Sequence, residues 1–286
     1  MIEGSAVMKK QQTSQFISKA MLYLILLVFV AFIAVPFVVM LSTSLKDEAS
    51  VFTYPPQWIP ETFHWENYAK VFLQLDLIRG FVNTLLIIIP PTLLGLLSSA
   101  FAAYSFSHLN FKGRDNLFFV FLMTMMLPGV ITMIPSYVIF TQIGWVDTWL
   151  PLIVPGSFGT AFCTFFLRQS FMTIPKDLIV AAKIDGMSHP RIFFTIILPL
   201  SKPALVTQAV LGFLAGYNDF LGPLIYINSS HKMTLQLMLS SLQGMYSSNF
   251  SILMAGAALA VVPTLILCIV SQKAFVRGIT MTGLKG

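Results

Sequence analysis

Six apolar runs, each about as long as a bilayer is thick, constrain the fold of this chain more than any other feature. The runs lie at about 21–41, 81–107, 117–140, 148–167, 203–227 and 251–271. A stretch of about 20 apolar residues is long enough for an α-helix to cross the hydrocarbon core. The runs therefore predict an all-α, polytopic membrane protein with six transmembrane helices.

The composition excludes the soluble classes of protein. Hydrophobic residues make up 56% of the chain and charged residues only 10%, whereas a soluble surface is about 25–35% charged. The net charge of +6 would suit a nucleic acid, but the basic residues lie in short loops rather than in a stripe with exposed aromatics. We expect membrane lipid, and no nucleic acid, as a partner.

The first run has two interpretations, a transmembrane helix or a signal peptide. A signal peptide has an apolar core of only about 7–15 residues and a small-residue cleavage site. The run of 21–41 is longer, and residues 42–46 form no convincing cleavage site. We therefore expect an N-terminal segment of 1–20, a six-span membrane domain of 21–271 and a tail of 272–286.

The distribution of basic residues predicts the orientation, because positive loops stay in the cytoplasm. With the N-terminus inside, thirteen lysines and arginines fall in the inner segments: three before the first run, Lys112, Arg114, five from Arg168 to Lys202, and three from Lys273 on. The outer segments hold four, namely Lys46, Lys70, Arg79 and Lys232. Both termini and the loop at 172–202 are thus expected in the cytoplasm.

That inner loop carries signals for two short helices. Pro175 suits the first turn of a helix, and Gly186 suits its C-terminal cap. The stripe that they enclose consists of Leu178, Ala181 and Ala182, at i, i+3 and i+4. Ser188 then suits the N-cap of a second helix that runs to Pro199. On pattern alone, these helices are either a docking knob for a soluble partner or a plain amphipathic connector.

The loop resembles the "EAA" coupling loop of ATP-binding-cassette importer permeases. The matching pattern is Ala181-Ala182-x-x-Asp185-Gly186, nine residues, then Ile196-x-Leu198-Pro199. Val180 stands where the family has Glu, and Met187 stands where it has Ala. The resemblance implies contact with an ATPase through Ala181, Ala182, Lys183, Asp185, Gly186, Leu198 and Pro199. We expect Asp185 to brace the turn by accepting backbone hydrogen bonds from the following helix.

The end of the chain extends the resemblance. Residues 272–280 and 284–286 are similar to the terminal signature of the maltose-permease-like branch of carbohydrate importers, with Thr282 in place of the usual Gly. This similarity implies a tail contact with the ATPases through Gln272, Lys273, Arg277, Gly278 and Lys285. Asn83-Thr84 also resembles that family, in which the outer loop at 228–250 reaches toward a binding protein.

Asp219 is the only carboxylate within a predicted span. A charge at that depth is costly, so by default it faces an aqueous path or a partner. The alternative is a structural hydrogen-bond bracket near the outer end of the fifth span. The candidates for a translocation path are Tyr217, Asn218 and Asp219, whose setting resembles the same span of sugar importers.

The chain has no energy source or catalytic centre of its own. No lysine follows a glycine, so a Gly-Lys-Ser/Thr phosphate loop is missing. The four histidines lie in different loops and indicate neither a metal site nor a catalytic triad. We predict that the chain is not an enzyme and binds no cofactor, and that ATP and Mg²⁺ are bound by partner subunits.

The leading hypothesis is a membrane subunit of a sugar or oligosaccharide importer. The resemblance implies two ATPase subunits, a second homologous permease, an extracytoplasmic binding protein and a bacterial plasma membrane. Two alternatives remain: an importer permease for another solute, such as glycerol phosphate or a polyol, and a stand-alone secondary transporter. The second is disfavoured because the spans show no obvious repeat pair and only Asp219 could carry coupling charge.

Overall fold

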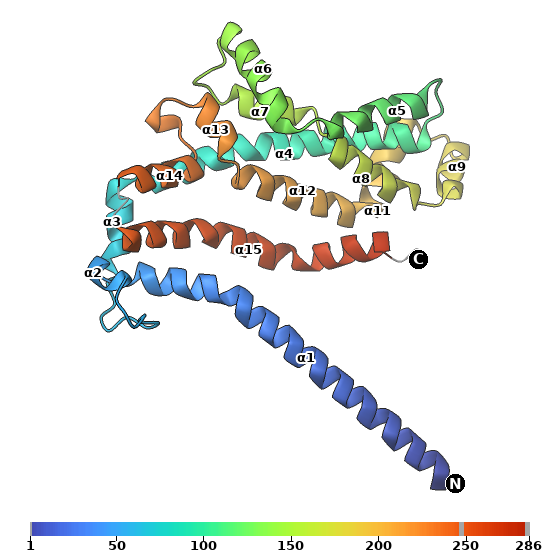
Figure 1. Cartoon of the computed structure of the whole chain (residues 1–286). Coiled ribbons are helices and arrows are strands. Elements are labelled where there is room, and N and C mark those ends of the chain that lie inside the picture. The colour runs from blue at the N-terminus through green and yellow to red at the C-terminus, as the bar shows by residue number, and fades with distance from the viewer. Residues whose placement is uncertain (1, 246–248, 284–286) are drawn as a thin grey trace. The chain divides into compact units, whose positions relative to one another are not determined.

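The computed structural model describes the backbone of residues 2–245 and 249–283 and the side chains of 18–242 and 249–272. In these ranges every element of regular structure is helical (Figure 1), which confirms the predicted all-α class. The elements are α1 (Ile2–Ser44), α2 (Glu48–Val51), α3 (Glu66–Gln74), α4 (Leu77–His108), α5 (Arg114–Met123), η1 (Thr124–Met126), α6 (Gly129–Gln142), α7 (Leu150–Ser157), α8 (Ala161–Met172), α9 (Lys176–Ile184), α10 (His189–Ile192), η2 (Phe193–Ile197), α11 (Leu198–Leu200), α12 (Lys202–Tyr217), α13 (Leu221–Tyr226), η3 (Ser230–Lys232), α14 (Leu235–Met245) and α15 (Phe250–Gly283).

Four stretches are long and apolar enough to cross a membrane. They are Ser18–Ser44, Leu77–His108, Leu150–Met172 and Phe250–Gln272. Two further candidates are bent pairs of helices, by 93° between α5–η1 and α6 and by 79° between α10–α11 and α12. The described part of the chain therefore holds four candidate spans, or six if each bent pair is one span.

The bend in the third predicted run lies at a proline. Leu127 has φ −80° and ψ 115°, outside the helical region, and Pro128 follows it. The ring of a proline disfavours the helical conformation in the residue before it. The predicted third span at 117–140 therefore contains two helices that meet at this break.

The fifth predicted run is also interrupted. The apolar run predicts one helix over 203–227, but α12 ends at Tyr217 and the short α13 begins only at Leu221. Asn218 lies at the C-terminal end of α12, where its side-chain Nδ2 donates to the carbonyl of Leu214 at 2.8 Å. Local side-chain hydrogen bonds of this kind compete with continuation of a helix.

The described chain forms two compact units, one of residues up to 73 with 249–259 and one of 74–245 with the residues from 260 on. In the first unit, the buried Asn67 fixes the turn after α1. Its Nδ2 donates to the carbonyls of Ser44 at 3.0 Å and Lys46 at 2.9 Å. The hydroxyl of Tyr68 lies 2.8 Å from that of Ser44. These bonds hold α3 against the end of α1.

In the second unit, α4 is the central helix, and α7, α8, α12 and α14 pack along it (Figure 1). Small residues make the contact with α7 close: a Cβ at Gly95 would collide with the carbonyl oxygen of Gly156. Ser98 Oγ donates to the carbonyl of Ser157 at 3.0 Å, and Ser99 Oγ accepts from the backbone of Thr160 at 3.2 Å. Small residues allow helices in membranes to approach in this way.

We predict that Gly95→Ala lowers the free energy of unfolding by about 1–3 kcal/mol, the usual cost of overpacking. The clash is with backbone, so no side chain can turn away to relieve it. The measurement is the thermal unfolding midpoint of the protein purified in detergent. Gly129→Ala is the matched control, because a Cβ there meets no atom within 4 Å. Equal midpoints for both variants would contradict the close approach of α4 and α7.

Candidate functional site

The first helix of the inner loop, α9, begins and ends at the predicted signals. Pro175 precedes it with φ −57° and ψ 129° and occupies the N-cap position, one residue before the predicted place. At the other end Gly186 has φ +77°. Its N–H donates to the carbonyl of Lys183 at 3.0 Å, and the N–H of Met187 donates to that of Ala182 at 2.9 Å. This pair of bonds is a Schellman motif, in which glycine is the favoured residue.

The buried face of α9 does not coincide with the predicted apolar stripe. Ile179 and Ala182 are buried, with 6% and 4% of their surface exposed, whereas Ala181 is exposed. Val180 and Ile184 are 54% and 81% exposed and lie on the opposite side of the helix from Ala182. Leu178, Ala181 and Ala182 therefore do not form one docking face. Ala182 points into the protein, and Val180, Ala181 and Ile184 form the outward face of α9.

The buried side of α9 belongs to a core that we call the loop core. It consists of Ala100, Ala103, Tyr104, Leu167, Phe171, Ile174, Ile179, Ala182, Ile192, Phe193, Ile197 and Ala204. These residues come from α4, α8, α9, α10, η2 and α12, except Ile174, which lies in the turn between α8 and α9. The loop is thus not a loose connector, because its helices share one hydrophobic core with three longer helices.

The second helix of the loop is continuous but changes its pitch. After α10, residues Phe193–Ile197 form a π-helical turn, and α11 follows. Ser188 has the extended backbone of an N-cap, yet its side chain makes no capping hydrogen bond. The helix is held against α4, where the hydroxyl of Tyr104 lies 3.0 Å from Nδ1 of His189 and the rings of Phe101 and Phe193 stack at 4.6 Å.

Of the other predicted coupling residues, Lys183, Asp185, Gly186 and Pro199 are exposed, and Leu198 is half-buried. The expected role of Asp185 is wrong. Among the residues that the structure describes, no backbone N–H donates to its carboxylate. The turn is held by the backbone bonds of the Schellman motif instead, so the Asp185 side chain is left free on the surface.

The three path candidates lie in different surroundings. Tyr217 is 1% exposed and its hydroxyl donates to the carbonyl of Ala260 at 2.9 Å, so it cannot line a path. Asn218 and Asp219 are exposed at the break between α12 and α13. Asp219 Oδ1 accepts from the N–H of Gly222 at 3.1 Å, which matches the structural bracket considered above. A path at Asn218 and Asp219 stays a prediction.

A cavity of about 430 Å³ lies between α4, α7, α8 and α12, and the sequence did not reveal it. Its lining includes Thr92, Gly95, Gly156, Cys163, Gln208 and Gly212. Gln208 is 6% exposed, and its Nε2 has no hydrogen-bond partner in the described chain. The available signal in the sequence was Gln208, the one amide in the first half of the run at 203–227. No group of three or more potential metal ligands occurs in the residues described.

The predicted tail continues the last span without a break, since α15 extends to Gly283. Gln272 is exposed. Lys273, Arg277 and Gly278 lie in α15, but their side chains fall outside the described ones, and Lys285 lies outside the described residues altogether. A contact of the tail with an ATPase stays a prediction.

Comparison with known proteins places these helices in a known group. Residues 92–281 match the family described as binding-protein-dependent transport system inner membrane component. The arabinooligosaccharides transport system permease of Halalkalibacterium halodurans is 34% identical over 97% of this chain and 100% of its own length. The lactose transport system permease of Rhizobium radiobacter is 34% identical over 75% and 78% of the two chains.

A solved structure shares the fold. It is a bacterial ABC transporter involved in the import of the acidic polysaccharide alginate, and one chain of it is 22% identical, with a TM-score of 0.76 over 91% of this chain and 97% of that one. The family match covers α4 from its middle, the inner loop and nearly all of α15. The chain therefore belongs to the family of inner membrane components of binding-protein-dependent transport systems.

Proposed function

We propose that this permease imports a sugar or oligosaccharide that an extracytoplasmic binding protein delivers. Two relatives at 34% identity carry the names of an arabinooligosaccharide and a lactose transport system. The chain that shares its fold comes from an importer of a polysaccharide. These likenesses to carbohydrate systems are the observation that carries the choice of substrate.

The proposed orientation has both termini in the cytoplasm of a bacterium. It rests on the excess of lysine and arginine in the inner segments, which include the residues around α9. In this orientation α9 faces the cytoplasm, and the N-terminal part of α4, where Asn83 bonds to the carbonyls of residues 231 and 233, faces outward.

Two cytoplasmic ATPases supply the energy and bind the ATP and Mg²⁺, and one of them docks on the outward face of α9. That face carries the apolar side chains of Val180, Ala181 and Ile184, at 54% and 81% exposure for the two larger ones. Large exposed apolar side chains that gather on one face mark contact sites for proteins. The Val180 position, where the coupling-loop pattern has Glu, makes this contact apolar rather than ionic.

The loop core transmits the movement of the ATPases to the membrane helices. Ile179 and Ala182 pack beside Phe171 of α8 and Ala103 of α4 in one buried cluster. Packed cores have low compressibility, so a displacement of α9 moves the cytoplasmic ends of α4 and α8 with it. The basic tail from Gln272 on adds a second contact with the ATPases, and a second, homologous permease completes the membrane part.

We expect purification of the tagged chain from its native membranes in mild detergent to recover the two ATPase subunits, a second permease and the binding protein. Uptake into vesicles should need internal ATP and external sugar-loaded binding protein. The measurement is uptake of radiolabelled oligosaccharide, with glycerol phosphate as the comparison solute. Uptake that persists on an ion gradient without ATP would contradict the proposal, and uptake of glycerol phosphate alone would contradict the choice of substrate.

We predict that the same substitution affects folding at one of two neighbouring alanines and ATPase binding at the other. Ala182→Trp should lower the yield of folded protein, because a large ring has no room in the loop core. Ala181→Trp should leave folding intact but reduce the amount of co-purified ATPase at least about tenfold, because about 1.4 kcal/mol of lost contact is enough for that. Ala69→Trp, at an exposed position of α3, is the matched control. Full ATPase recovery with Ala181→Trp would mean that α9 does not dock there.

The positive φ of Gly186 predicts a graded response at that position. Gly186→Val should destabilise the turn by about 1 kcal/mol or more, because a β-branched residue is strained at φ +77°. Gly186→Asn should be milder, since Asn tolerates this region, and neither side chain meets an obstacle within 4 Å of Cβ. Transport-coupled ATP hydrolysis in reconstituted complexes measures the effect. An equal loss with both variants would show that the side chain, not the backbone, matters.

A further inference from the structure

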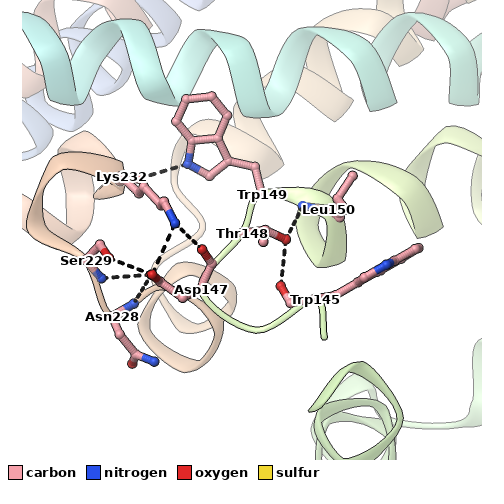
Figure 2. A network of polar contacts seen from close by, with 8 residues as sticks. All are labelled: Trp145, Asp147, Thr148, Trp149, Leu150, Asn228, Ser229 and Lys232. Carbon is pink, nitrogen blue, oxygen red and sulfur yellow. Dashed lines mark hydrogen bonds and ion pairs between the residues drawn. The ribbon is translucent and has the colours of Figure 1, made fainter. Parts of the chain in front are cut away.

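Asp147 joins two loops that are far apart in the sequence (Figure 2). It lies between α6 and α7, facing the segment that follows α13. Asp147 has φ +57° and is the one non-glycine residue with a positive φ in the described chain. Residues other than glycine adopt this region at a cost, and the surrounding structure has to hold them there.

The carboxylate of Asp147 accepts four hydrogen bonds from the facing loop (Figure 2). Oδ1 accepts from the backbone N–H groups of Asn228 at 3.0 Å and Ser229 at 2.8 Å. Oδ2 accepts from the hydroxyl of Ser229 at 2.6 Å and from Nζ of Lys232 at 3.1 Å. The backbone N–H of Asp147 donates to the carbonyl of Tyr226 at 2.8 Å.

Further hydrogen bonds from Trp149 and from α4 hold the same loop. Trp149 Nε1 donates to the carbonyl of Lys232 at 3.1 Å. From α4, Asn83 Nδ2 donates to the carbonyls of residues 231 and 233 at 3.0 and 2.9 Å. Thr84 Oγ1 accepts from the N–H of Leu235 at 2.9 Å. Residues 228–235, which we call the outer loop segment, are therefore fixed between α4 and the loop of Asp147.

The same hydrogen bonds also stabilise the charged form of the Asp147 carboxylate. The hydroxyl of Ser229, and then the N–H groups of Ser229 and Asn228, hold the pKa of the Asp147 carboxyl well below its usual range. Donors to a carboxylate stabilise its charged form. Asp147 is thus an anion at neutral and mildly acidic pH, and its bond to Lys232 is an ion pair.

While its anchoring groups are covered, the outer loop segment presents polar side chains to solvent. Asn228, Ser230 and His231 are exposed, whereas Thr234 and Leu235 are buried. In the orientation proposed above this surface lies outside the membrane, on the side from which a binding protein arrives. A loop that is ordered before binding loses less conformational entropy when its partner docks.

We propose that Asp147 is the positioning residue that holds the outer loop segment in the shape that receives the binding protein. This inference rests on the proposed function. The carboxylate does not contact the binding protein itself; it fixes the backbone that displays Asn228, Ser230 and His231. Lys232 adds to this anchoring, because its Nζ pairs with the Asp147 carboxylate and donates to the Asp147 carbonyl at 2.5 Å.

The test uses the importer purified with its ATPases and reconstituted in nanodiscs, with the sugar-loaded binding protein that co-purifies with it as the probe. Asp147→Asn keeps the size of the side chain and its tolerance of positive φ but removes the charge and an acceptor. The concentration of binding protein that gives half-maximal ATP hydrolysis should rise about tenfold. The rate at saturation should fall less than about twofold, and amide exchange of residues 228–235 should accelerate.

Asp76→Asn is the matched control and should leave all three readouts unchanged. Within the described side chains, the carboxylate of Asp76 pairs only with the nearby Arg79 at the start of α4. Asp147→Gly removes the backbone strain together with the carboxylate and should behave like Asp147→Asn.

Wild-type half-saturation in either Asp147 variant would overturn the proposal, even if exchange accelerates or yield falls. If Asp147→Asn does not assemble, Lys232→Met provides the same comparison. A wild-type complex that the binding protein does not stimulate would refute the proposed function instead.

Discussion

The burial of Ile179 and Ala182 in one core with residues of α4 and α8 is the contact on which the proposed coupling through the inner loop depends. An amphipathic helix that merely rested on the membrane would have its apolar side in lipid. Here that side is part of the loop core, at 6% and 4% exposure, and the helix is closed by the Schellman turn at Gly186. The outward face is therefore left exposed. Under the proposed function, movement of an ATPase docked there would reach the membrane helices through packed side chains rather than through a flexible linker.

Much of the fold was predictable because hydropathy and helix signals are local. The apolar runs gave the all-α class, and Gly186 marked the end of α9. The buried face of α9 was not predictable from spacing. Leu178, Ala181 and Ala182 lie at helical spacing, but so do Ile179 and Ala182, which are the buried residues. Which side is buried was decided by residues such as Ala103 and Phe171, which are distant in the sequence or belong to another helix.

The helix breaks and the hydrogen bonds of Asp147 were also not predictable from local patterns. Pro128 was visible in the sequence, but a proline in a membrane helix produces a kink as readily as a break. The break at Asn218 depends on short side-chain bonds to nearby backbone. Asp147 lies 79 to 85 residues from its partners in the chain, and no spacing rule connects an aspartate of one loop with the N–H groups of another.

The outward face of α9 also has a consequence for a subunit that has not met its partners. Val180 and Ile184 are exposed on the same helix surface while the chain is alone. Apolar side chains gathered on a surface in this way invite unspecific association. If an ATPase docks on this face as proposed, an unassembled copy of this permease therefore exposes apolar surface that assembly covers, and it is more prone to unspecific association than the complete importer.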